Sequence, residues 1–123
     1  MIIDDDPDDI EFFVEAVRSI DASIECKQAT NGEEGLASLR NGEVDPQYIF
    51  LDLNMPRLNG KEFLSEIKKD EKLSDIPVIM YSTSGIESDI RESLRLGARD
   101  FIVKPTRLSE LTARIEEVMS PED

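Results

Sequence analysis

Residues 48–60 read YIFLDLNMPRLNG, and this stretch indicates how the chain folds. It begins with an uninterrupted apolar run, Tyr48–Leu51, which ends at the acidic residue Asp52. A strand without alternation of apolar and polar residues is buried on both faces, as is typical of the middle of a parallel sheet. The sequence therefore predicts a central parallel strand with a carboxylate at its carboxyl end.

Other segments of the chain have the apolar character of strands or the spacing of helices. The further predicted strands are Ile2–Ile3, Ile24–Lys27, Val78–Tyr81 and Phe101–Val103. Apolar residues recur at helical spacing within residues 10–17, 36–39, 63–67, 90–96 and 108–118. Because strands and helices alternate, we expect an α/β fold in which residues 1–123 form one domain, with helices on both faces of a parallel sheet.

Polar residues mark where the first and last helices begin. Asp6 followed by Pro7 is typical of a helix start, with Asp6 as N-cap and Pro7 in the first turn. Asp8 and Asp9 would then lie near the positive end of the helix dipole, which favours negative charge. Thr106 is predicted to cap the last helix.

Composition excludes several classes of protein. The net charge is -14, from 28 acidic and 14 basic residues, so we expect no direct binding to nucleic acid or to an anionic membrane. The chain has no histidine and a single cysteine, which excludes histidine-dependent catalysis, histidine metal ligands and an internal disulfide. No apolar run approaches transmembrane length, and a cytoplasmic location is predicted.

Reactive side chains follow the predicted strands at the point where each strand ends. Asp4 and Asp5 follow the first strand, Asp52 the third, Ser82 the fourth and Lys104 the fifth. The carboxyl ends of parallel strands share one edge of the sheet, where such folds bind ligands. Clustered carboxylates need a cation, and Mg²⁺ or Mn²⁺ suits oxygen ligands. An ionised Asp52 beside a metal, with a lysine and a hydroxyl nearby, is typical of a phosphoryl acceptor.

The motifs IIDDD, FLDLNMPRLNG, YSTSG and FIVKPT occur in this order along the chain. Together they resemble the receiver domains of two-component response regulators, over essentially the whole chain. The chain is similar to chemotaxis-type single-domain receivers, including the phytochrome-associated group. The resemblance implies a flavodoxin-like, five-stranded sheet of order 2-1-3-4-5. It also implies a phosphoacceptor that catalyses only its own phosphorylation and dephosphorylation, rather than an enzyme.

The resemblance also implies a role for individual positions. Asp52 would be the phosphoacceptor, Lys104 would pair with it, and Ser82 would move toward the phosphoryl group. Phe101 would switch together with Ser82. The metal ligands would be Asp5, Asp52, the backbone carbonyl of Asn54, and Asp4 directly or through water. The family usually has a cis bond before the proline, so a cis Lys104–Pro105 bond is expected.

The partners implied are a sensor histidine kinase or phosphotransfer protein as phosphohistidine donor, a downstream protein target and a possible second copy of the chain. Whether an output domain follows Asp123 is left open. One alternative is a small phosphatase of the haloacid dehalogenase type, although Asn54 stands where such enzymes have a second aspartate. Another is a phosphorylation-independent binding module.

Overall fold

Five parallel strands form one sheet in the computed structural model, which describes residues 1–120. The strands are β1 (Ile2–Ile3), β2 (Gln28–Ala29), β3 (Ile49–Leu51), β4 (Val78–Ser82) and β5 (Asp100–Val103). The helices are α1 (Pro7–Ile20), α2 (Gly32–Arg40), α3 (Gly60–Lys69), α4 (Glu87–Arg95) and α5 (Leu108–Met119). The strand order is β2-β1-β3-β4-β5, and every pair is parallel. The predicted fold class and strand order are confirmed.

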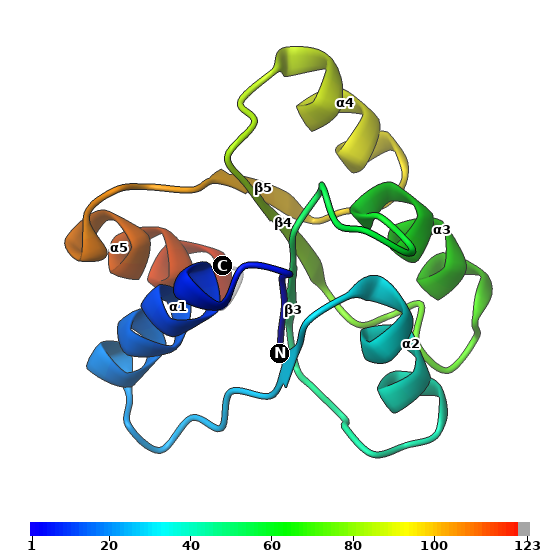
Figure 1. The fold of residues 1–123 in the computed structure, drawn as a ribbon, viewed down its shortest axis with the longest axis horizontal. Coiled ribbons are helices and arrows are strands. Elements are labelled where there is room, and N and C mark those ends of the chain that lie inside the picture. Colours follow the sequence, from blue (N-terminus) through cyan, green and yellow to red (C-terminus); the bar gives the residue numbers. More distant parts are fainter. Residues whose placement is uncertain (121–123) are drawn as a thin grey trace.

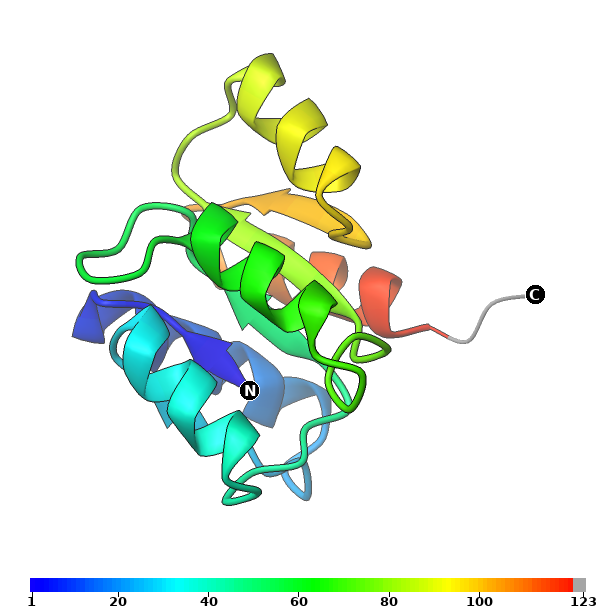
Figure 2. The same cartoon turned by 90° about the vertical axis from the view of Figure 1, so that its right-hand side faces the viewer.

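Helices cover both faces of the sheet (Figure 1). Helices α1 and α5 lie side by side on one face, while α2, α3 and α4 cover the other, as the rotated view in Figure 2 shows. Each face has its own apolar core. Phe13, Phe50 and Tyr81 pack together on the α1 side, with ring centroids 4.8 and 5.5 Å from that of Phe13. Phe63 and Met80 belong to the core on the α3 side.

The second strand lies further along the chain than predicted. Residues 24–27 do not form a strand, although the Lys27 carbonyl accepts a hydrogen bond from the Ile2 N–H at 2.8 Å, and β2 is formed by Gln28–Ala29 instead. A strand is defined by its neighbour, and β1 pairs with β2 through Ile2 and Ile3 alone. The alternation of apolar and polar residues suggested a strand at Ile24–Lys27. It reflects instead a half-buried segment that lacks the full set of hydrogen bonds to a neighbouring strand.

The predicted helix signals were right at the first helix and wrong at the last. The Asp6 side chain accepts a hydrogen bond from the Asp8 backbone N–H, and Pro7 is the first helical residue. Helix α5 begins after Arg107, without a side-chain cap, so the predicted Thr106 cap is wrong. Helix α4 ends at Arg95, and Gly97, just after its C-cap Leu96, has a φ of 112°, a conformation that favours glycine.

The peptide bond between Lys104 and Pro105 is trans, because the described chain has no cis peptide bond. The expected cis bond is therefore wrong for this structure. The trans form is the ordinary one before proline, favoured by about 0.5–1 kcal/mol.

Candidate functional site

Three carboxylates lie together at the carboxyl edge of the sheet. Asp4 and Asp5 follow β1, and Asp52 follows β3, the neighbour of β1 in the sheet. Each side chain offers a carboxylate oxygen, and these three oxygens lie within 4.8 Å of one another. The fold thus brings together the acidic residues predicted to bind a metal, although they are separated by almost fifty positions along the chain.

The two carboxylate oxygens of Asp4 have different surroundings. Oδ1 accepts a hydrogen bond from the Asp6 backbone N–H at 3.0 Å. Oδ2 is buried and accepts no hydrogen bond of suitable angle, although it forms an ion pair with the Lys104 ammonium at 2.8 Å. The three convergent carboxylates carry more negative charge than one ammonium balances, and carboxylate oxygens are ligands that suit a hard divalent cation. The donor set therefore fits Mg²⁺ or Mn²⁺.

Lys104 follows β5 and reaches the carboxylates with an almost fully buried side chain. Its Nζ lies 2.8 Å from Asp4 Oδ2, 2.8 Å from Asp9 Oδ2 and 3.6 Å from Asp52 Oδ1. It also lies 5.1 Å from the centroid of the Tyr81 ring, within cation–π range. Burial alone would lower the pKa of Lys104, but its ion pairs with Asp4 and Asp9 and the charge of Asp52 outweigh burial and raise the pKa. The ammonium is therefore charged at neutral pH.

Burial also shifts the carboxyl groups. It raises the pKa of Asp52 to about 7; the Lys104 ammonium opposes this rise, and the charges of Asp4 and Asp5 add to it. Burial likewise raises the pKa of Asp4, again against the effect of Lys104. The cluster therefore takes up protons close to neutral pH unless a cation balances its charge.

Helix α3 begins directly against the predicted acceptor. The Gly60 N–H donates to the Leu53 carbonyl at 2.9 Å. A Cβ atom on Gly60 would lie only 2.5 Å from the Asp52 carbonyl oxygen. Asn59 and Glu62 form a capping box that fixes the first turn of the helix. The absence of a side chain at Gly60 is what lets this helix and the end of β3 approach so closely.

Ser82 is linked to two helices by polar contacts. It is fully buried at the end of β4, and its Oγ accepts a hydrogen bond from the Ser84 N–H at 3.2 Å. The Ser84 hydroxyl donates to Asp89 of α4 at 3.1 Å. Lys61 of α3 pairs with Asp89 at 3.0 Å and with Glu92 at 2.6 Å. A continuous line of polar contacts therefore runs from the Ser82 hydroxyl to α4 and α3.

The two remaining predicted positions are Asn54 and Phe101. Neither has a contact that tests its predicted role. Asn54 is exposed in the loop after Asp52. Phe101 lies in β5, is 7% exposed, and belongs to the apolar core on the α3 side. Metal binding by the Asn54 carbonyl and switching by Phe101 stay predictions.

Two residues of the cluster were not predicted as part of it. Asp9 had been assigned only to the helix dipole, and Tyr81 only to a buried strand. A positional signal for Asp9 exists, because α1 starts where β1 ends and its first turn therefore stands over the carboxyl edge of the sheet. An acidic residue in that turn lies within reach of a lysine that follows β5.

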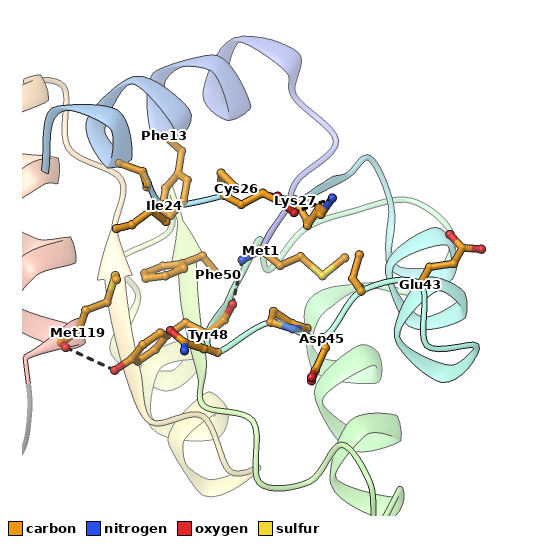
Figure 3. A pocket seen from close by; sticks show the side chains of 15 residues that line it. Met1, Phe13, Ile24, Cys26, Lys27, Glu43, Asp45, Tyr48, Phe50 and Met119 are labelled. Carbon is orange, nitrogen blue, oxygen red and sulfur yellow. Dashed lines mark hydrogen bonds and ion pairs between the residues drawn. The ribbon is translucent and has the colours of Figure 1, made fainter. Parts of the chain in front are cut away.

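A cavity of about 550 Å³ lies at the other edge of the sheet, near the amino ends of the strands (Figure 3). Met1, Cys26, Tyr48 and Phe50 are among its lining residues, and the Met1 ammonium donates to the Tyr48 carbonyl at 2.9 Å. None of the predicted site residues lines it. The cavity is therefore separate from the carboxylate cluster.

Comparison with known proteins identifies relatives of this chain. Residues 1–116 match the response regulator receiver domain. The phosphate regulon transcriptional regulatory protein PhoB of Pseudomonas aeruginosa is 34% identical over 119 residues, which are 97% of this chain and 50% of PhoB. The sensor histidine kinase CheAY of Helicobacter pylori is 34% identical over 89 residues, 72% of this chain and 11% of CheAY. The chain thus spans half or less of these relatives.

Solved structures resemble the fold closely. The phosphorylated cyanobacterial phytochrome response regulator RcpA has a TM-score of 0.86 at 34% identity, covering 95% of this chain and 87% of RcpA. The Mn²⁺-bound response regulator Rcp1 has a TM-score of 0.78 at 27% identity, covering 95% and 88%. The CheX–CheY–BeF₃–Mg²⁺ complex of Borrelia burgdorferi matches with a TM-score of 0.83 at 28% identity, covering 98% and 87%. Among residues 1–120, none of the helices has both the length and the apolar character needed to cross a membrane.

Proposed function

This chain belongs to the response regulator receiver domains, which act in two-component signalling as phosphoacceptors rather than as enzymes, and from this premise we propose that Asp52 is its acceptor. The observation that supports this assignment is the carboxylate cluster. Asp52 follows β3, the middle strand of the sheet, and its Oδ1 lies 3.6 Å from Lys104 Nζ, whereas Asp4 is already paired with that ammonium at 2.8 Å. Asp52 therefore lies beside both the other carboxylates of the predicted metal site and the Lys104 ammonium.

The proposed reaction is a direct transfer. An Asp52 carboxylate oxygen attacks the phosphorus of a phosphohistidine, the new O–P bond forms, and the N–P bond to the histidine breaks with its electron pair returning to the imidazole. The Lys104 ammonium stabilises negative charge on the phosphoryl oxygens. Burial of Asp52 and Ser82 limits the access of water to the acyl phosphate.

We propose that Asp4, Asp5 and Asp52 hold one Mg²⁺ or Mn²⁺, with the Asn54 carbonyl as a further ligand. When bound, the cation neutralises the carboxylates and the phosphoryl oxygens. The Mn²⁺ and Mg²⁺ named for Rcp1 and for the Borrelia complex support this assignment. The chain itself contributes the placement: Asp4 is held by the hydrogen bond from the Asp6 N–H, and Asp5 is exposed to solvent.

We propose that phosphorylation is read out through Ser82 and α4. Movement of the Ser82 hydroxyl toward a phosphoryl group would remove the acceptor of the Ser84 N–H, and Ser84 is bonded to Asp89 of α4. Ser93 is the buried residue of α4, so polar contacts contribute much of its attachment. Phe101 would change its packing with this movement.

The proposed partners follow from the family. Receiver domains work with histidine kinases, so a sensor histidine kinase or phosphotransfer protein is proposed as donor, and a protein as downstream target. The absence of histidine from this chain means that the donor histidine must come from another protein or from a part outside this sequence. A cytoplasmic location, a homodimer and the extent of the domain over residues 1–123 remain proposals.

Phosphorylation by a small donor tests the assignment. The protein is incubated with acetyl phosphate and Mg²⁺, and its mass is measured. Wild type is expected to gain one phosphoryl group, and Asp52→Asn to gain none. Asp45→Asn, in the loop before β3, is the matched control and should label like wild type. Failure of wild type to label beside a competent receiver would overturn the function, and labelling of Asp52→Asn would overturn the assignment to Asp52.

A further inference from the structure

Asp9 contacts the lysine of the site in addition to the two carboxylates of the triad that pair with it. Its Oδ2 accepts a hydrogen bond from Lys104 Nζ at 2.8 Å, between residues 95 positions apart. The Asp9 side chain is 32% exposed, whereas that of Lys104 is 8% exposed. A partly solvated carboxylate therefore fixes a buried ammonium.

Helix capping does not account for this contact. The N-cap of α1 is Asp6, whose side chain accepts the bond from the Asp8 N–H. Asp8 and Asp9 both lie in the first turn, where either charge interacts favourably with the helix dipole. Of these two residues, Asp9 contacts Lys104. Stabilisation of the helix alone therefore does not explain its position.

Asp9 also lies outside the predicted metal site. The three carboxylates whose oxygens converge within 4.8 Å are Asp4, Asp5 and Asp52. Two of these, Asp4 and Asp52, are also partners of Lys104. A cation bound to them would share their negative charge, whereas Asp9 would keep its own for the ammonium.

We propose that Asp9 is a positioning residue, which keeps the Lys104 ammonium beside Asp52 without binding the cation. The inference rests on the proposed phosphoacceptor function. Lysine is a point charge on a flexible stem, so an anchor on each side is needed to hold it in place. At 3.6 Å from Asp52 Oδ1, the ammonium stands slightly beyond hydrogen-bonding distance of the acceptor. It is therefore placed for the oxygens of a phosphoryl group attached to Asp52.

The test compares Asp9→Asn with Asp8→Asn, which removes the same charge from an exposed position in the same helical turn. Three quantities are measured: the acetyl phosphate labelling rate at saturating Mg²⁺, the Mg²⁺ affinity by calorimetry, and the exchange of Lys104 ammonium protons with water by ¹⁵N NMR. In Asp9→Asn, labelling should slow roughly tenfold while the Mg²⁺ affinity changes less than about twofold. Ammonium exchange should accelerate. Asp8→Asn should change none of the three, and Asp9→Glu should restore most of the labelling rate.

Several results would overturn the proposal. Unchanged labelling and ammonium exchange in Asp9→Asn would remove Asp9 from the site. A fall in Mg²⁺ affinity that accounts for the slower labelling would make Asp9 a metal residue. An equal effect of Asp8→Asn would reduce it to a helix charge. If Asp9→Asn folds poorly, Asp9→Glu decides by the same three measurements, and failure to restrain the ammonium there is a contradiction. If wild type does not label, the proposed function fails, while ammonium exchange still tests the Asp9 contact.

Discussion

Two lysines of this protein each pair with several carboxylates, but in opposite surroundings. Lys104 has an 8% exposed side chain, and its partners Asp4 and Asp52 are 0% and 8% exposed. Lys61 is 32% exposed, and its partners Asp89 and Glu92 are 25% and 43% exposed. This second cluster is therefore partly exposed throughout, whereas in the first only Asp9, at 32%, is as exposed. The N–O distances in the two clusters overlap, so distance does not separate them. Solvation does, because water screens the exposed pairs and leaves the buried ones almost unscreened.

The difference teaches where each cluster can act. In the buried cluster every charge depends on the others, so a cation or a phosphoryl group at Asp52 alters the balance strongly. In the partly exposed cluster water can compete with each partner, so we expect the contact between α3 and α4 to contribute less to stability. The first arrangement suits chemistry, and the second suits a helix that changes its position.

Replacement of Lys104 is expected to have the largest effect. Lys104→Met leaves buried carboxylates without their ammonium, and the loss of one partner from a buried ion pair destabilises by about 3–5 kcal/mol. The loss should be measured by urea unfolding at pH 8 in EDTA. It should shrink near pH 5, where the carboxyl groups protonate. A loss no larger than that of Lys61→Met would show that burial does not separate the two clusters.

The pH dependence of the metal-free protein comes from one of the same buried carboxyl groups. The folded-state pKa of Asp52 is raised from 3.8 to about 7, so the folded state holds this proton more tightly than the unfolded state. Stability therefore falls as pH rises from about 4 to 7, and stays lower above it, by up to about 4 kcal/mol for about three pKa units of about 1.36 kcal/mol each. Asp52→Asn has no such proton and should show a flatter profile in EDTA. Superimposable profiles would contradict the raised pKa.

Binding of Mg²⁺ is expected to have the next largest effect on stability. Saturation at 100 times the dissociation constant adds about 2.7 kcal/mol to the unfolding free energy, because the cation binds the folded site. Thermal unfolding with and without Mg²⁺ measures the gain. Asp5→Asn should blunt it, since Asp5 belongs to the carboxylate triad. Lys61→Met should keep the full gain, and an undiminished gain in Asp5→Asn would contradict the metal site.

The partly exposed cluster should give the smallest effect. Lys61→Met is expected to lower Tm by less than about 4 °C, because exposed ion pairs contribute little. The difference should shrink further in high salt. Hydrogen exchange should nevertheless rise in residues 87–95, since Lys61 bonds Asp89 and Glu92 of α4. Unchanged exchange in α4 would mean that the Lys61 contacts do not hold the helix.

The buried cluster was largely predictable from sequence, for a geometric reason. Residues that follow parallel strands meet at one edge of the sheet, so Asp4, Asp5, Asp52 and Lys104 could be brought together from strand ends alone. Asp9 was missed because it lies in the first turn of α1 and not directly after a strand, and the helix dipole alone already explained an acidic residue there. The partly exposed cluster left no signal, because charged residues on helix surfaces are common.

The fold was predictable in its order and less so in its boundaries. Continuous apolar runs identified β3 and β4, since such runs suit buried parallel strands. The position of β2 could not be read from Ile24 and Cys26, because pairing depends on a neighbour far away in sequence. The start of α5 at Leu108 agrees with the predicted helix, but its cap was missed, since the N-cap is Arg107 and no side chain caps the helix as expected of Thr106.

The site also depends on a steric requirement at Gly60, which involves no charge. A methyl group there would meet the Asp52 carbonyl oxygen at 2.5 Å and the Leu53 Cα at 2.8 Å, so either the helix or the strand end must move. Gly60→Ala would therefore push helix α3 and the end of β3 apart. It would displace Asp52 although every predicted metal ligand is still present. The position of Asp52 relative to Lys104 and a bound cation therefore depends on the absence of a side chain at Gly60.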